Sequence, residues 1–178
     1  MQKRILLFLL LGVTLKAALA EPGDELEYPV KAAMIYNFTR FVEWPPAAWR
    51  TPQEPMVVGV LGSGPAERAL AETLRGKSYA GRNIQVTRLH GIENIPGCQV
   101  LFVAASEKKH LPEILRLAHG SGILTVSDIP DFVASGGVIG FLVEDQRVRF
   151  EIGAAAARQA GLVISSKLLN LATGQGGK

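Results

Sequence analysis

Short segments with the composition of β-strands alternate with segments of helical periodicity through the middle of the chain. Four segments are interpreted as strands, at residues 56–61, 84–89, 99–104 and 123–126. The first is continuously apolar, which is typical of a strand that is covered on both faces. Helices are predicted from the Gly62-Ser63-Gly64-Pro65 turn to about residue 75 and over residues 111–119, where Gly120 is a stop signal. Strands that alternate with helices predict βαβ units, and therefore a parallel sheet with helices on both faces.

A segment before the first strand has the periodicity of one more helix. Four apolar residues recur at spacings of four, four and three: Val30, Met34, Phe38 and Phe41. This spacing places them on one helical face, while Lys31 and Arg40 project elsewhere. Pro29 suits the first turn of a helix, and Pro45-Pro46 is expected to end it.

The last third of the chain has a different pattern. An apolar run at residues 138–143 and a polar turn at 144–146 precede residues 147–152, in which apolar and charged residues alternate. This pattern predicts an antiparallel hairpin whose second strand is half-exposed and lies at the edge of the sheet, guarded by its charges. Short helices are expected at residues 154–160 and 167–172. No repeat or low-complexity linker divides the chain, so we predict one domain.

The first residues have the organisation of a secretory signal peptide. Lys3 and Arg4 precede an apolar run at residues 5–15, and Ala18-Leu19-Ala20 forms a small-x-small cleavage pattern. A retained membrane anchor is disfavoured, because the run is shorter than the roughly 20 residues that a spanning helix needs and Lys16 interrupts it. We therefore expect residues 1–20 to be removed, leaving a domain at residues 21–178. No cysteine at the cleavage site can carry a lipid, so a soluble periplasmic protein is expected.

Charge disfavours one class of partner. The chain has a net charge of +3, but the predicted signal peptide contains three of its cations and no acid. The predicted mature chain therefore has 16 basic and 16 acidic residues. A neutral surface without a basic stripe gives nucleic acid little electrostatic attraction, so no nucleic-acid partner is expected.

The single cysteine, Cys98, cannot form an intramolecular disulfide. It lies at the entrance of the apolar run at residues 100–103, where a small buried cysteine is common. A redox thiol or an intermolecular disulfide is the alternative. Either would need an activating His or Lys or an exposed position, and the sequence shows neither.

Motifs for cofactors and metals are absent from the sequence. Gly59, Gly62 and Gly64 follow a strand and precede a helix, but their spacing matches neither common phosphate-binding loop. We interpret them as a tight turn, with an anion site at the helix N-terminus as the alternative. The three histidines lie in different segments without ligand spacing, and no nucleophile elbow is present. We therefore expect no cofactor, no metal and no catalytic residue.

Asp128 and Asp131 follow the fourth predicted strand, at the end of the sheet where open α/β folds bind ligands. Acid-base chemistry is one interpretation, and capping of the next helical turn is the other. A small-ligand pocket between residues 62–65 and 127–131 also stays open. The predicted mature chain is too short for a two-lobed solute-binding protein.

An aromatic cluster near the N-terminus is the strongest candidate for a binding surface. Five aromatic residues fall within 14 positions: Tyr36, Phe38, Phe41, Trp44 and Trp49. Tryptophan and tyrosine are common anchors of protein interfaces. The alternative is structural, with the two phenylalanines in the core and Trp44 covering one end of the sheet.

Several motifs follow one another along nearly the whole predicted mature chain. They lie at residues 30–45, 60–62, 100–106, 124–128, 136–141, 147–152, 160–162, 165–166 and 168–169. In these motifs the chain resembles the YfiR-like family of exported bacterial proteins. The resemblance implies an α/β/α sandwich. Combined with the patterns above, it predicts a mostly parallel Rossmann-like sheet with a C-terminal antiparallel edge hairpin.

The resemblance also implies a periplasmic regulator without catalytic activity. Well-known members form homodimers and repress an inner-membrane diguanylate cyclase of the YfiN type through its periplasmic portion. An outer-membrane lipoprotein can sequester such a repressor, which releases cyclic-di-GMP synthesis and favours biofilm formation. Those members have paired cysteines that form disulfides, whereas this chain has Cys98 alone. A divergent branch with a sensor kinase or another membrane receptor as its partner is therefore also open.

Our leading hypothesis is a repressor that acts by binding through an exposed apolar patch. The contact residues expected from the sequence are Trp44, Tyr36, Phe41 and Pro45, with Asp128 and Phe132 as secondary candidates. A small-ligand sensing domain that feeds a membrane receptor is the alternative. A hydrolase would rest only on scattered Ser, His and Asp residues.

Overall fold

The computed structural model describes residues 24–173 and 175–176. The predicted signal peptide at residues 1–20 lies outside these described residues. No helix in the described part of the chain is both long enough and apolar enough to span a membrane.

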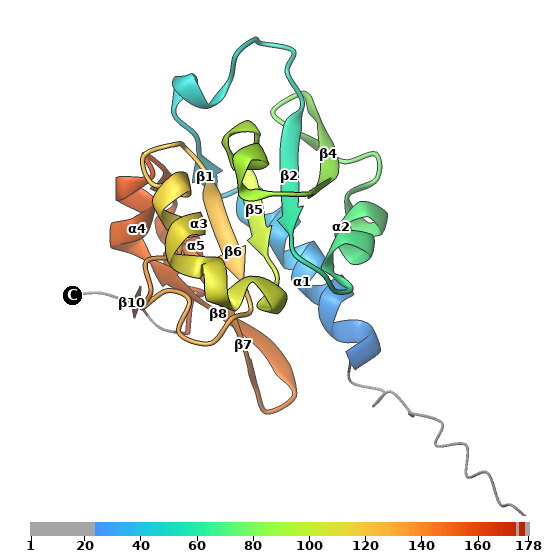
Figure 1. The fold of residues 1–178 in the computed structure, drawn as a ribbon, viewed down its shortest axis with the longest axis vertical. Coiled ribbons are helices and arrows are strands. Elements are labelled where there is room, and N and C mark those ends of the chain that lie inside the picture. The colour runs from blue at the N-terminus through green and yellow to red at the C-terminus, as the bar shows by residue number, and fades with distance from the viewer. Residues whose placement is uncertain (1–23, 174, 177–178) are drawn as a thin grey trace, which may run out of the picture.

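A mostly parallel sheet forms the centre of the fold (Figure 1). Within the described residues it has eight strands in the order β10-β8-β7-β6-β5-β2-β4-β3. Their bounds are β2 Met56–Leu61, β3 Ser78–Tyr79, β4 Arg82–Leu89, β5 Val100–Val103, β6 Leu124–Ser127, β7 Ile139–Glu144, β8 Arg147–Gly153 and β10 Gln175–Gly176. Neighbouring strands from β4 to β7 run parallel, whereas β3 and β8 run antiparallel to β4 and β7. A separate two-stranded sheet pairs β1, Val42–Glu43, with β9, Val163–Ile164.

Helices cover both faces of the central sheet, which makes the fold an α/β/α sandwich. The α-helices are α1 Asp24–Thr39, α2 Ala66–Leu74, α3 Leu111–Ala118, α4 Ala154–Gln159 and α5 Ser166–Leu169. Short 3-10 helices are η1 Pro46–Ala48, η2 Ile92–Gly97 and η3 Ala105–His110. In Figure 1, α3 lies in front of the sheet and α1 behind it. One core lies between the sheet and α1, α2 and α4, and a second lies between the sheet and α3 and η2.

The predicted fold class is confirmed, together with most of its elements. β2 has the predicted bounds, and β4, β5, β6, α2 and α3 differ from prediction by at most two residues at either end. The hairpin is β7–β8, and its turn residues Asp145 and Gln146 both have positive φ values of 49° and 61°. β10 pairs with only Ile152 and Gly153, so most of β8 lies at the edge as expected. The two-residue strands β1, β3, β9 and β10 were not predicted.

The prediction for the N-terminal helix was partly wrong. α1 starts at Asp24, so Pro29 lies inside it, and it ends at Thr39 before Pro45-Pro46. Its buried apolar face consists of Ala32, Ile35 and Phe38, whereas Val30 is 43% exposed. Lys31, expected to project away from the core, is buried.

The prediction for Cys98 is confirmed. The thiol is free and buried, and it packs in the core on the α3 side of the sheet. Burial raises its pKa to about 11. A cysteine in this state stays protonated near neutral pH and is a poor nucleophile.

Candidate functional site

Aromatic side chains from three segments meet near the amino ends of the parallel strands. Trp44 follows β1, and its indole Nε1 donates a hydrogen bond of 3.1 Å to the carbonyl oxygen of Gln99, just before β5. The Tyr79 ring meets Trp44 edge-on, with centroids 5.2 Å apart and an interplanar angle of 74°. Trp49 stacks on Tyr79, with centroids 6.0 Å apart and planes at 15°. The two tryptophans are therefore joined through a tyrosine from the edge of the sheet.

Two cations extend this cluster. The Arg82 guanidinium lies 4.1 Å from the Trp49 ring centroid, and its Nη1 donates to the carbonyl oxygens of Thr51 and Glu54 at 2.9 and 2.8 Å. The Nζ of Lys77 lies 5.5 Å from the ring centroid of Tyr36 on α1. Cations at such distances are attracted to aromatic faces. We name Tyr36, Trp44, Trp49, Lys77, Tyr79 and Arg82 the aromatic–cation surface.

The residues of the aromatic–cation surface differ in how much of each side chain is exposed to solvent. Trp44 is only 8% exposed, so its ring serves mainly the core. Tyr36, Trp49, Tyr79 and Arg82 are half-buried, and Lys77 is exposed. The area open to a partner is therefore contributed by the residues around Trp44.

The Tyr79 hydroxyl is fixed within this surface. Burial, with a smaller effect from the Glu43 carboxylate, raises the pKa of this phenol above its usual value of 10.0. The hydroxyl therefore stays protonated at neutral pH and donates to the Val42 carbonyl oxygen at 3.4 Å. The ring that joins the two tryptophans is thus tied to β1.

Phe41 and Pro45 lie near this surface and are half-buried. Phe41 packs partly against the core on the α1 side of the sheet, and its carbonyl oxygen accepts a hydrogen bond of 2.9 Å from the Ser165 backbone. Pro45 immediately precedes η1. Both keep some surface open to solvent beside Trp44.

Asp128 and Phe132 lie at the opposite end of the sheet, after β6. Phe132 is fully buried against the core on the α3 side. Asp128 accepts hydrogen bonds at Oδ2 from Lys31 Nζ at 2.7 Å and from the Tyr28 hydroxyl at 2.9 Å. The structure therefore does not bring these two residues together with the other predicted contact residues.

Lys31 is the centre of a buried ionic cluster that the sequence interpretation missed. Its side chain is 3% exposed and pairs with both Asp128 and Glu27. The Tyr28 ring lies 4.5 Å from Nζ, which adds a cation–π contact. Asp128 Oδ1 is buried without a hydrogen-bond partner among the described residues. A buried lysine needs such partners, because an unpaired charge is costly inside a protein.

Ser127 holds the start of the loop after β6, where the next described element is β7 and no helix is present to be capped. Its hydroxyl donates to the Val103 carbonyl oxygen at 2.7 Å and accepts from the Ile129 backbone N–H at 3.0 Å. The loop after β6 is therefore held by Ser127, which leaves Asp128 free to pair with Lys31.

A hollow at the carboxyl ends of β2 and β4 is a candidate pocket for the ligand-sensing interpretation. It has a volume of about 280 Å³ and is lined by Gly62, His90, Glu107, His110, Glu113 and neighbouring apolar residues. Residues 127–131 do not line it, so the two loops expected to share a pocket are not joined by this hollow. No group of three or more His, Cys, Asp or Glu in the described ranges could hold a metal ion.

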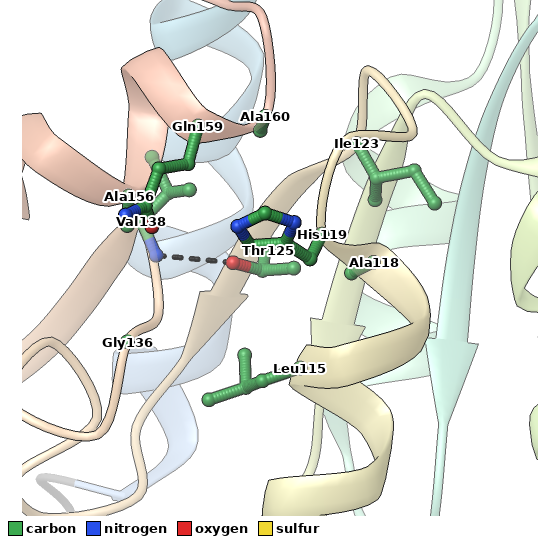
Figure 2. Close-up of a pocket in the computed structure, with 10 residues that line it drawn as sticks. All are labelled: Leu115, Ala118, His119, Ile123, Thr125, Gly136, Val138, Ala156, Gln159 and Ala160. Carbon is green, nitrogen blue, oxygen red and sulfur yellow. Dashed lines mark hydrogen bonds between the residues drawn. The ribbon is translucent and has the colours of Figure 1, made fainter.

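A second pocket lies between α3 and α4 (Figure 2). It is lined by His119, Thr125, Gln159 and seven other residues, and the Thr125 hydroxyl accepts a hydrogen bond of 3.0 Å from the Val138 backbone. Its volume of about 20 Å³ has room for only about one water molecule. It is therefore too small for an organic ligand.

Sequence reasoning missed three members of the aromatic–cation surface: Lys77, Tyr79 and Arg82. They come from β3, β4 and the turn before β3, more than 25 residues after Trp49. A charge pattern could have pointed to them, since residues 75–92 contain four Lys and Arg residues and no Asp or Glu.

Comparison with known proteins places this chain in a family. A family model described as YfiR/HmsC-like matches residues 28–173, which include both ends of the sheet and the aromatic–cation surface. A comparison with individual curated proteins gives no match. Because the family model covers most of the chain, the protein belongs to the YfiR/HmsC-like family.

Proposed function

We propose that this protein is a non-catalytic periplasmic regulator that binds and represses an inner-membrane diguanylate cyclase, and so modulates cyclic-di-GMP and biofilm formation. The family match over residues 28–173 is the observation that carries this proposal. Membership of the family supports a periplasmic regulator of diguanylate cyclase signalling in general. The identity of the receptor and the repression itself are the parts that we propose.

The aromatic–cation surface is the proposed contact with the receptor. Aromatic residues and arginine dominate the binding energy of many protein interfaces. Tyr36, Trp49 and Tyr79 offer half-exposed rings, and Lys77 and Arg82 add positive charge beside them. The rings are held by α1, β3 and η1, so little conformational freedom is lost when a partner binds.

Repression would follow from differential binding. The regulator would bind the inactive arrangement of the receptor's periplasmic portion more tightly than the active one, which shifts the receptor population toward inactivity. A competing partner for the same surface, such as an outer-membrane lipoprotein, would release the receptor. We also propose a homodimer, which would present the surface twice to a dimeric receptor.

An affinity pull-down from detergent-solubilised membranes tests the proposal. The bait is the protein purified from the periplasm, with Tyr36→Ala and Lys77→Glu as surface variants and Lys109→Glu as a control. Lys109 is exposed on η3, away from the surface. We expect wild type and Lys109→Glu to retain one diguanylate cyclase or sensor kinase, and the surface variants to lose it. Equal retention by all four baits would refute this contact surface, and no retention by wild type would refute the receptor proposal.

A small-ligand sensing domain is the second candidate function. It is favoured by the hollow of about 280 Å³ at Gly62, which lies at the carboxyl ends of β2 and β4, where α/β folds bind ligands. A thermal-shift screen with amino acids, nucleotides and cell-wall fragments tests it. A bound ligand raises the melting temperature by mass action, and no rise with any compound would count against this candidate.

A further inference from the structure

β4 has a bare outer edge over most of its length. On one side it pairs with β2 from Ile84 to Leu89. On the other side its described strand partner is β3, which pairs only with Arg82 and Asn83. Residues 85–89 therefore form an open edge of the sheet, because the Ile84 N–H is still bonded on the β3 side, and such edges are templates for pairing with another chain.

One hydrogen bond fixes which backbone groups point outward from this edge. The Ile84 N–H donates to the Lys77 carbonyl oxygen at 3.2 Å, on the β3 side. Because hydrogen-bonding direction alternates along a strand, the backbone groups of Val86 and Arg88 also point away from β2. They form a ladder of donors and acceptors that an extended segment can complete.

Hollows lie on both faces of this edge. On the α2 face, one of about 370 Å³ is lined by Ala71, Leu74, Arg75 and residues 84–87. On the opposite face, one of about 340 Å³ is lined by Val57, Leu89, Cys98 and neighbouring residues. Side chains of an added strand point alternately to the two faces, so each face offers space for every second residue.

Charge distinguishes the two faces and indicates the chemistry of the occupant. Arg75 ends α2 and is exposed, and the Arg88 guanidinium reaches the α2 face, where it lies 3.7 Å from Glu67. Because both side chains of that ion pair are half-exposed, it contributes little to the stability of the fold, and Arg88 is available to another carboxylate. The opposite hollow is lined by Val57, Leu89 and Cys98 together with the polar residues Thr87, Arg88, His90 and Asn94. Residues 75–92 contain no Asp or Glu, so pairing with a second copy would bring like charges together, which disfavours a homodimer at this edge.

We propose that the free edge of β4 binds an extended acidic segment of a partner protein as an additional strand of the sheet. Carboxylates of the segment face Arg75 and Arg88 on the α2 side, and small apolar side chains enter the hollow at Val57 and Leu89. The partner is defined by this alternation of acidic and apolar residues. The inference goes beyond the proposed function, because residues 85–89 adjoin the aromatic–cation surface without being part of it and the segment need not belong to a diguanylate cyclase.

Fluorescence anisotropy with a designed peptide tests this inference. The probe is a fluorescein-labelled peptide of eight residues that alternates glutamate with valine, titrated with the protein purified from the periplasm. One control peptide has lysine in place of glutamate, and another has the same composition with all glutamates before all valines. We expect saturable binding of the alternating acidic peptide, weakened by salt, and no binding of either control.

Variants of the edge separate strand pairing from simple charge attraction. Val86→Pro removes an outward N–H that the sheet itself does not use, and Val86→Thr keeps it. We expect Val86→Pro to weaken peptide binding about tenfold and Val86→Thr to leave it within about twofold of wild type. In wild type, hydrogen exchange of the Val86 and Arg88 amides should slow when the peptide is bound.

A charge reversal keeps the test decisive if Val86→Pro fails to fold. The double variant Arg75→Glu/Arg88→Glu changes two exposed side chains. It should reverse the charge preference of the β4 edge, so that the lysine peptide binds and the glutamate peptide does not. The proposal is overturned if the acidic peptide does not bind, if binding is unaffected by these variants, or if it protects amides elsewhere. The peptide titration does not depend on the membrane receptor. A pull-down that retains no receptor would therefore refute the proposed function without refuting strand addition at β4, and the reverse also holds.

Discussion

Lys31 Nζ lies 2.7 Å from Asp128 Oδ2, which joins α1 to the loop after β6 across 97 residues of sequence. Both side chains are largely buried, with exposures of 3% and 12%. The Tyr28 hydroxyl and Glu27 complete the cluster. This pair fixes the first half of α1 against the carboxyl end of the sheet, while the second half carries Tyr36 to the aromatic–cation surface.

Lys31→Met should destabilise the fold strongly. Removing one partner of a buried ion pair leaves the other charge uncompensated, which costs about 3–5 kcal/mol. Urea denaturation monitored by circular dichroism measures the loss. The control Lys109→Met changes an exposed side chain and should stay within about 0.5 kcal/mol of wild type. Equal stability of Lys31→Met and the control would contradict the structural role of this pair.

Trp44→Ala should lower the stability of the fold, and any effect on partner binding should be secondary to that loss. The ring is 8% exposed and donates to the Gln99 carbonyl oxygen, so truncation removes packing and one of the two hydrogen bonds to that acceptor, which keeps the bond from the Leu124 N–H. We expect a loss of about 3–5 kcal/mol in the free energy of unfolding. Tyr36→Ala, at a half-buried position on the same surface, should cost clearly less. If Trp44→Ala unfolds at the same urea concentration as wild type, the packing role is wrong.

The Cys98 thiol should be unreactive in the native protein. Burial raises its pKa to about 11, so the thiolate is a very minor species at pH 8. Ellman's reagent should modify the thiol slowly in buffer and rapidly after unfolding in urea. Rapid stoichiometric modification of the folded protein would show that Cys98 is accessible, in conflict with its buried position.

The raised pKa of the Cys98 thiol should make the stability of the fold depend on pH. Since the folded-state pKa lies above the unfolded value of about 9, the native state holds the proton more tightly. This contribution is fully present below about pH 9 and is lost as pH rises toward 11. Between those values, wild type should therefore lose about 2 kcal/mol more stability than Cys98→Ala. Parallel curves for the two proteins would contradict the shift.

Gly59 and Cys98 should be energetically coupled. A Cβ added at Gly59 in β2 would overlap the Cys98 Sγ and crowd Leu89. We expect Gly59→Ala to cost about 1–3 kcal/mol through overpacking, and less when combined with Cys98→Ala, which removes the clashing sulfur. A double-mutant cycle from urea unfolding measures the coupling. Strict additivity would mean that the two positions do not touch.

Local patterns were sufficient to predict most of the fold. The continuous apolar run of β2 and the alternation in β8 each depend on which face of a strand is buried, so they can be read without knowing the partners. The same approach misplaced the buried face of α1. A periodicity of apolar residues does not reveal a buried lysine, and Lys31 is buried through partners that include Asp128, far away in sequence.

The candidate surface could be predicted only in part. Tyr36, Trp44 and Trp49 lie close together in sequence, so their proximity was visible as a cluster. Tyr79 comes from a two-residue strand with no periodicity to detect, and it joins the tryptophans only through tertiary packing. Burial of Trp44 likewise depends on Gln99, 55 residues later.

Cellular cyclic-di-GMP in a deletion strain tests the central claim most directly. The strain is complemented with wild type, Tyr36→Ala/Lys77→Glu or Lys109→Glu, each exported at matched levels that an immunoblot verifies. We predict that deletion raises cyclic-di-GMP, that wild type and Lys109→Glu restore the low level, and that the surface variant does not. Cyclic-di-GMP unchanged by deletion under several growth conditions would contradict the account.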